Sequence, residues 1–209
     1  MTAGFILAVI DACACYDAQA VTDSLHSDSA ARAIQDSINR AQPHYIVDSI
    51  FPIAEEIRRF NADSPPVDSL RGGAKGRQAL VRRFTAALAK HDTATLLSLF
   101  VTRAEFGQLV FPESPHVRPP FKTKPSVIWG QLVNESEKSL SRLLQRLAGP
   151  AVQISGLECP APERHGKNLI WRRCTVLVRD PQRGEKRMCL FTILERGGRA
   201  KFLLYTTDF

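Results

Sequence analysis

Apolar residues recur at helical spacing through the first 149 residues of the chain. In the segment 77–90, the apolar residues Leu80, Phe84 and Leu88 would share one face of a helix. Asp92 then stands where it could cap the N-terminus of the next helix. By the same spacing, we predict helices over residues 27–41, 52–60, 77–90, 93–100 and 126–149, and a short helix that starts at 103.

The pattern changes after residue 150, where four runs rich in β-branched and aromatic residues are separated by turn-like segments. Helices followed by sequential strands predict an α+β fold, in which N-terminal helices pack on a C-terminal antiparallel sheet of about four strands. We expect this single domain to cover residues 25–209. The predicted strands cover residues 151–159, 169–178, 187–195 and 201–207. Alternation along the second strand predicts one face with Ile170, Cys174, Val176 and Val178 and an opposite face with Trp171, Arg173, Thr175 and Leu177.

We expect residues 1–24 to form a signal or lipoprotein-type N-terminal segment, whose apolar run of eight or so residues is far shorter than the roughly 20 needed to span a bilayer. The apolar run is followed by Ala18-Gln19-Ala20, which resembles the cleavage site of a secretory signal. A second export route would make Cys13 or Cys15 the lipid-bearing residue of a lipoprotein. We therefore expect a periplasmic, envelope-attached or secreted protein. A cytoplasmic chain is the alternative, because no Lys or Arg precedes the apolar run.

Charge adds little to this picture. The chain has 28 basic and 21 acidic residues and a formal charge of +7, but the two signs are interspersed along the chain. A nucleic-acid-binding module would combine a basic stripe with exposed aromatic residues, whereas most aromatic residues here occupy core-like positions. The sequence therefore argues against nucleic acid as the partner.

The cysteines outside the N-terminal segment are Cys159, Cys174 and Cys189. Cys159 ends one predicted strand and Cys174 lies in the next, so that a hairpin could bring them to disulfide distance. Such a bond would suit an oxidising compartment; the alternative is three small buried hydrophobic residues. No Cys-x-x-Cys or closely spaced Cys/His pair predicts a metal site, and the Gly-rich segment 62–76 lacks the spacing of a phosphate-binding loop. We therefore expect no metal and no cofactor.

One stretch, EFGQLVFPESPHVRPPF at residues 105–121, brings acids, bases and aromatic residues together. Thr102 and Glu105 match a capping box, which gives Glu105 a structural role at the start of a helix. His116 is a candidate for proton transfer because an unperturbed histidine titrates near neutral pH; the alternative is a solvated side chain in a Pro-rich loop. We predict a short helix followed by a strap that borders a pocket.

Five phrases within residues 77–209 carry a family resemblance: LVRRFTAALAKHD, TRAEFGQLVFPESP, SEKSLSRLL, NLIWRRC and GRAKFLLYTTDF. They resemble uncharacterised bacterial exported proteins of the cone-shaped superfamily that includes nuclear-transport-factor-2-like and ketosteroid-isomerase-like (cystatin-like) proteins. The resemblance implies a curved sheet and a pocket between its concave face and the helices, with binding of a small molecule there by analogy. Enzymes of this superfamily use acid and base residues inside the cone, and no such set can be matched here residue by residue.

Three functions remain open at this point. The first is a non-enzymatic domain that binds a small apolar or amphiphilic ligand in the pocket, although its aromatic lining would equally suit a filled core. The second is an enzyme of the ketosteroid-isomerase-like kind that uses Glu105, His116 or Tyr205 for proton transfer. The third is a structural or interaction protein that forms a homodimer through one face of the sheet. The predicted pocket residues are Phe106, Phe111, Trp129, Trp171 and Tyr205.

Overall fold

The structure is a computed structural model that describes residues 51–121, 123–182 and 184–207, together with residues 30, 33–35, 37–38 and 41. The chain divides into two compact units, Met1–Ile50 and Phe51–Phe209. In the first unit, residues 30, 33–35 and 37–38 are helical, in agreement with the helix predicted over 27–41. The predicted signal or lipoprotein segment, including Cys13 and Cys15, lies outside the described residues.

The second unit begins with helices that follow the predicted amphipathic segments. Asp92 caps its helix as expected, because its carboxylate accepts a hydrogen bond from the amide of Thr95 at 2.9 Å. Donation by the Thr95 hydroxyl, and next by this amide, also holds the pKa of Asp92 below its ordinary value. The helices are α2 (Ile53–Asn61), α3 (Arg77–Ala89), α4 (Thr93–Ser98), α5 (Arg103–Glu105) and α6 (Pro125–Leu147). Between α5 and α6 lie a π-helical turn, η1 (Phe106–Val110), and two 3-10 turns, η2 (Phe111–Glu113) and η3 (Pro115–Val117).

The sheet is antiparallel and confirms the predicted α+β class; in the part of the chain that the structure describes it has six strands, where about four were expected. The strand order is β1-β6-β5-β4-β2, and β3 pairs with β4 outside this path. The two strands that the sequence did not predict, β1 and β3, have two and three residues and lie within segments that read as loops. The strands are β1 (Ala74–Lys75), β2 (Gln153–Glu158), β3 (Glu163–His165), β4 (Asn168–Asp180), β5 (Gly184–Arg196) and β6 (Arg199–Tyr205).

A β-bulge in β4 overturns part of the predicted alternation. The pairing of β4 with β5 shifts between Trp171 and Cys174, where Arg173 has a φ of 53°. As a result Ile170 packs in a different apolar cluster from Cys174, and Trp171 packs against the cluster of Cys174. The prediction that Ile170 shares a face with Cys174, Val176 and Val178 is therefore wrong. Strict alternation assumes a regular strand, and the extra residue of the bulge reverses the faces on either side of it.

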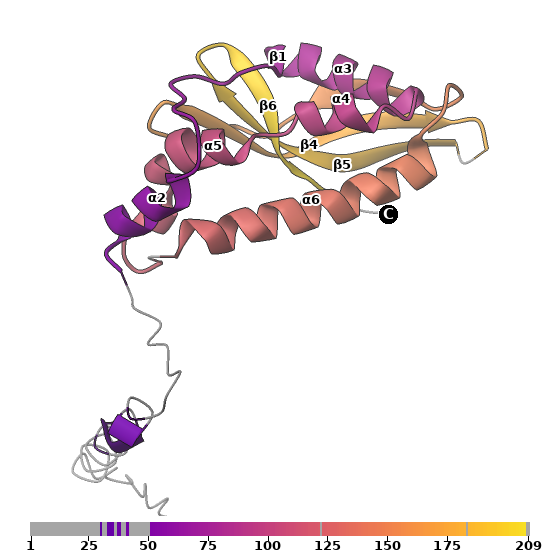
Figure 1. Cartoon of the computed structure of the whole chain (residues 1–209). Coiled ribbons are helices and arrows are strands. Elements are labelled where there is room, and N and C mark those ends of the chain that lie inside the picture. Colours follow the sequence, from indigo (N-terminus) through magenta and orange to yellow (C-terminus); the bar gives the residue numbers. More distant parts are fainter. Residues whose placement is uncertain are drawn as a thin grey trace, which may run out of the picture. The chain divides into compact units, whose positions relative to one another are not determined.

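Two apolar clusters form the core of the second unit. In the first, α3, α4 and the C-terminal part of α6 pack against one face of the curled sheet, and Figure 1 shows the sheet behind these helices. In the second, α2, η1 and the N-terminal part of α6 pack on Ile170, Leu194 and Leu203. The long helix α6 contributes to both clusters and leads to the paired ends of β4 and β5, which line a pocket.

Candidate functional site

Glu105 forms a buried ion pair. Its carboxylate accepts a hydrogen bond from the Lys201 ammonium at 2.8 Å, and the two side chains are 1% and 2% exposed. It also accepts from the backbone amides of Arg71 and Thr102, both at 2.7 Å. The Thr102 hydroxyl accepts in turn from the Glu105 amide at 3.2 Å, which completes the predicted capping box. The carboxylate therefore joins α5 to β6 and to the loop at Arg71.

The other two acid–base candidates lie elsewhere. The Tyr205 hydroxyl is buried and donates to the carbonyl of Leu96 at 2.9 Å, and burial raises the pKa of Tyr205 well above its ordinary value. His116 lies in η3 with its ring 5.9 Å from that of Phe121. None of the five pockets found among the described residues is lined by more than one of Glu105, His116 and Tyr205. The structure does not assemble these residues into one site.

The five aromatic residues predicted to line a pocket pack in three places. Phe106 contacts Phe111 and Trp129, with ring centroids 5.8 and 5.3 Å apart, in the second apolar cluster. Tyr205 lies in the first cluster and borders a cavity of about 60 Å³. Trp171 lies under the guanidinium of Arg77, 3.5 Å from its ring centroid, and donates to Glu195. Ligand binding by this set stays a prediction, and the larger pockets have other linings.

The structure contains a disulfide between Cys159 and Cys174, which are 15 residues apart in sequence. Cys174 is buried in the core, whereas Cys159 follows the end of β2. The bond therefore ties the segment that contains β3 to the bulged part of β4. By the loop-closure relation, a loop of this length contributes about 3 kcal/mol.

Of the five pockets found among the described residues, the one with the greatest volume, about 350 Å³, lies between the end of α6 and the paired ends of β4 and β5. This is at the lower end of the roughly 300–1,000 Å³ that is typical of small-ligand sites. Leu147 of α6, Val178 of β4 and Met188 of β5 give it an apolar floor. The remaining lining residues are Arg146, Asp180, Gly184 and Lys186.

Lys186 gives the rim of this pocket a positive charge on the face of the sheet that the helices cover. Lys186 is directly paired with Val178, and residues directly opposite in an antiparallel pair share a face. Its side chain is exposed and forms no hydrogen bond or ion pair with another described residue. Lys186 is not among the site residues predicted from the sequence, although the alternation that includes Met188 and Leu190 places it on this face.

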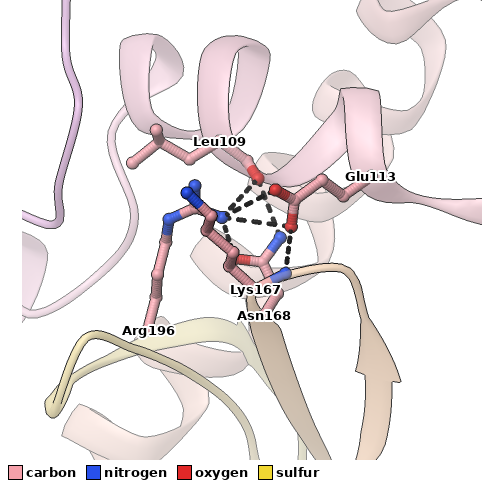
Figure 2. A network of polar contacts seen from close by, with 5 residues as sticks. All are labelled: Leu109, Glu113, Lys167, Asn168 and Arg196. Carbon is pink, nitrogen blue, oxygen red and sulfur yellow. Dashed lines mark hydrogen bonds and ion pairs between the residues drawn. The ribbon is translucent and has the colours of Figure 1, made fainter.

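A second group of polar residues lies around Asn168, the first residue of β4, and Figure 2 shows the contacts among them. Arg196 Nη1 donates to both carboxylate oxygens of Glu113, at 3.0 and 3.1 Å, and to Asn168 Oδ1 at 3.0 Å. The buried Asn168 amide donates to the carbonyl of Leu109 at 2.7 Å, and the Lys167 amide donates to Glu113 at 2.9 Å. This network fixes the η1–η2 segment to the turn between β3 and β4. Next to it lies a pocket of about 170 Å³.

Two further observations limit the chemistry of the described residues. Within residues 51–121, 123–182 and 184–207, no group of three or more His, Cys, Asp or Glu side chains is placed to hold a metal ion. None of the helices that the structure describes combines the length and apolar character needed to cross a membrane.

Comparison with known proteins adds no family. No protein-family model matches the chain, and neither a curated protein nor a solved structure does. The function must therefore be argued from the geometry of the chain itself.

Proposed function

We propose that residues 51–207 form a binding domain for a small amphiphilic anion, held in the pocket between α6 and the β4–β5 hairpin. The hydrocarbon part would lie on Leu147, Val178 and Met188, and the anionic head would lie towards Lys186. The observation that carries the proposal is the combination of an apolar floor with a cation on the same face of the sheet.

Two interactions would stabilise the bound ligand. Each methylene group that leaves water on an apolar surface contributes about 0.8 kcal/mol, so that a short hydrocarbon chain is enough for measurable binding. The charge at Lys186 then selects the head group, since an anion is attracted and a cation repelled at the pocket rim. Arg146 and Asp180 add one charge of each sign to the lining, so that Lys186 sets its net charge.

Binding is proposed in preference to catalysis because the candidate acid–base residues are engaged separately. Glu105 is held by Lys201 and two amides, and the Tyr205 hydroxyl donates to a backbone carbonyl. A general base must reach the same reacting group as its acid partner. The pocket between α6 and the hairpin is lined by none of Glu105, His116 and Tyr205.

Isothermal titration calorimetry with decanoate tests this proposal. We expect saturable binding of one decanoate per chain, and binding about tenfold weaker, or 1.4 kcal/mol, for decyltrimethylammonium, which has the same chain and the opposite charge. Lys186→Glu should weaken decanoate binding by a similar factor. Lys75→Glu makes the same charge change at an exposed residue of β1 and should leave the affinity unchanged. Equal affinity for both head groups, or no saturable heat, would contradict the proposal.

We also propose that the protein is exported and related to the cone-shaped superfamily that its sequence resembles. The Cys159–Cys174 disulfide supports an oxidising compartment, and a curled antiparallel sheet packed against helices is compatible with a cone. Mass spectrometry of the N-terminus of the native protein tests export. A cleaved or lipidated N-terminus is expected, and an intact, unmodified Met1 would count against it.

A further inference from the structure

The pocket beside Glu113 is lined by a carboxylate that is already hydrogen-bonded within the protein and by donors that have no partner among the described residues. Its lining consists of Glu113, Ser114, Pro115, Arg118, Arg164, His165 and Gly166. The Glu113 carboxylate accepts from Arg196 and from the Lys167 amide, so that its negative charge is matched within the protein. The charge that this lining offers to a ligand is therefore positive.

Two buried polar atoms in the lining residues lack a partner. Ser114 is only 8% exposed, and its hydroxyl has no hydrogen-bond partner among the described residues. The Nδ1 atom of His165 is also buried without a partner, while its Nε2 lies 3.5 Å from Glu163. Leaving a buried donor unsatisfied is unfavourable, and such atoms in native structures call for an explanation. A ligand that accepts hydrogen bonds would satisfy the hydroxyl.

Two arginines complete the arrangement. Arg118 follows η3 and Arg164 lies in β3, and both are exposed. Neither guanidinium forms a hydrogen bond or ion pair with another residue in the described part of the chain. Guanidinium groups match the oxygens of phosphate and carboxylate groups with two parallel hydrogen bonds.

From these contacts we infer that the pocket lined by Ser114, Arg118, Arg164 and His165 is a binding site for a small oxyanion of the phosphate class. Arg118 and Arg164 bind the anionic oxygens, and the Ser114 hydroxyl donates to one of them. The volume of about 170 Å³ suits a single phosphate group or its monoester. This site is separate from the pocket between α6 and the hairpin, and its existence does not depend on the proposed function.

The test is a titration of the ¹⁵N-labelled protein with inorganic phosphate, at ionic strength held constant with sodium chloride, followed by two-dimensional NMR. Saturable shifts are expected at the amides of Ser114 and His165 and at the side-chain Nε–H groups of the two arginines. The double variant Arg118→Gln/Arg164→Gln should bind phosphate at least about tenfold more weakly. Ser114→Ala should weaken binding by a smaller factor while the spectrum stays that of the folded protein.

The matched control is Arg82→Gln/Arg142→Gln, which removes two exposed arginines from α3 and α6 and so makes the same change in net charge. It should bind phosphate like the unaltered protein. Shifts that grow linearly without saturation, or an equal loss of affinity in both double variants, would show non-specific attraction of counter-ions and overturn the inference. Saturable shifts confined to residues around Lys186 would overturn it as well.

Discussion

Glu105 and Glu113 lie eight residues apart in one helical stretch, and each forms an ion pair with a basic residue on the β5–β6 side of the sheet. The ion pair of Glu105 with Lys201 is buried, with side chains that are 1% and 2% exposed. The pair of Glu113 with Arg196 is 27% and 13% exposed and borders a pocket. Both carboxylates also accept backbone amides.

The two ion pairs differ in what surrounds each carboxylate. The Glu105 carboxylate accepts from Lys201 and from two backbone amides and is 1% exposed, so that a ligand has no access to it. Around Glu113 the carboxylate is matched, but its neighbours Ser114, Arg118 and Arg164 are not. We interpret the Glu105–Lys201 ion pair as a structural element of the fold and the Glu113–Arg196 ion pair as part of the proposed oxyanion site.

Replacement of each carboxylate by its amide should give the largest contrast. Glu105→Gln leaves the Lys201 ammonium buried without a counter-charge, and we expect a loss of about 3–5 kcal/mol in the free energy of unfolding. Glu113→Gln should cost about 1 kcal/mol, because Arg196 keeps Asn168 as a partner and remains partly hydrated. Urea denaturation measures both values.

The double variant Glu105→Gln/Lys201→Met is the control for this interpretation. It removes both buried charges, so that it should be more stable than Glu105→Gln alone. Equal costs for Glu105→Gln and Glu113→Gln would show that burial does not separate the two pairs.

Gly73 lies against the Glu105–Lys201 ion pair, and Gly166 lies against the Glu113–Arg196 ion pair. A Cβ atom on Gly73 would contact the carbonyl of Ala200 and come within 2.6 Å of Lys201 Cγ, whereas one on Gly166 would come within 2.6 Å of the Glu113 carboxylate. The backbone carbonyl of Ala200 cannot move away from an added Cβ atom on Gly73, whereas the end of the Glu113 side chain can move away from one on Gly166. We expect losses of about 3 kcal/mol for Gly73→Ala and about 2 kcal/mol for Gly166→Ala.

Gly72→Ala separates backbone strain from overlap. Gly72 also has a positive φ, of 75°, but an added Cβ would meet no atom within 4 Å. Its cost in thermal or urea unfolding should be about 1 kcal/mol, from the left-handed conformation alone. A cost for Gly73→Ala no larger than that for Gly72→Ala would contradict the tight packing around Lys201.

The smallest contrast concerns two hydroxyl residues at helix N-caps. Thr102→Ala removes the acceptor for the Glu105 amide and should cost about 1 kcal/mol. Ser114→Ala removes a hydroxyl with no partner and should change the free energy of unfolding by less than about 0.5 kcal/mol. A loss at Ser114 equal to that at Thr102 would mean that its hydroxyl supports the fold.

The sequence predicted the longer elements because their periodicity is strong, as in α3, α6 and β5. It did not predict β1 and β3, since two or three residues cannot establish a period, nor the bulge at Arg173, since an inserted residue leaves no mark on composition. The capping role of Glu105 was visible because Thr102 is three residues away.

The candidate sites were harder to predict because their residues come from distant segments. Lys201 is 96 residues from Glu105, and Arg196 is 83 residues from Glu113. Which strand ends meet a helix is decided by tertiary packing, and that information is absent from local spacing. The stretch 105–121 was correctly identified as crowded with polar groups, but the partners that distinguish Glu105 from Glu113 all lie outside it.

The most direct test of the proposed ligand site uses Met188, because the chain has only two methionines and the other is Met1. In protein labelled with [methyl-¹³C]methionine, the Met188 resonance is assigned with Met188→Leu and followed during titration with decanoate. We predict that it shifts and saturates in the unaltered protein, and that it shifts far less at the same decanoate concentrations in Lys186→Glu. A Met188 resonance that stays unchanged throughout the titration would contradict ligand binding between α6 and the hairpin.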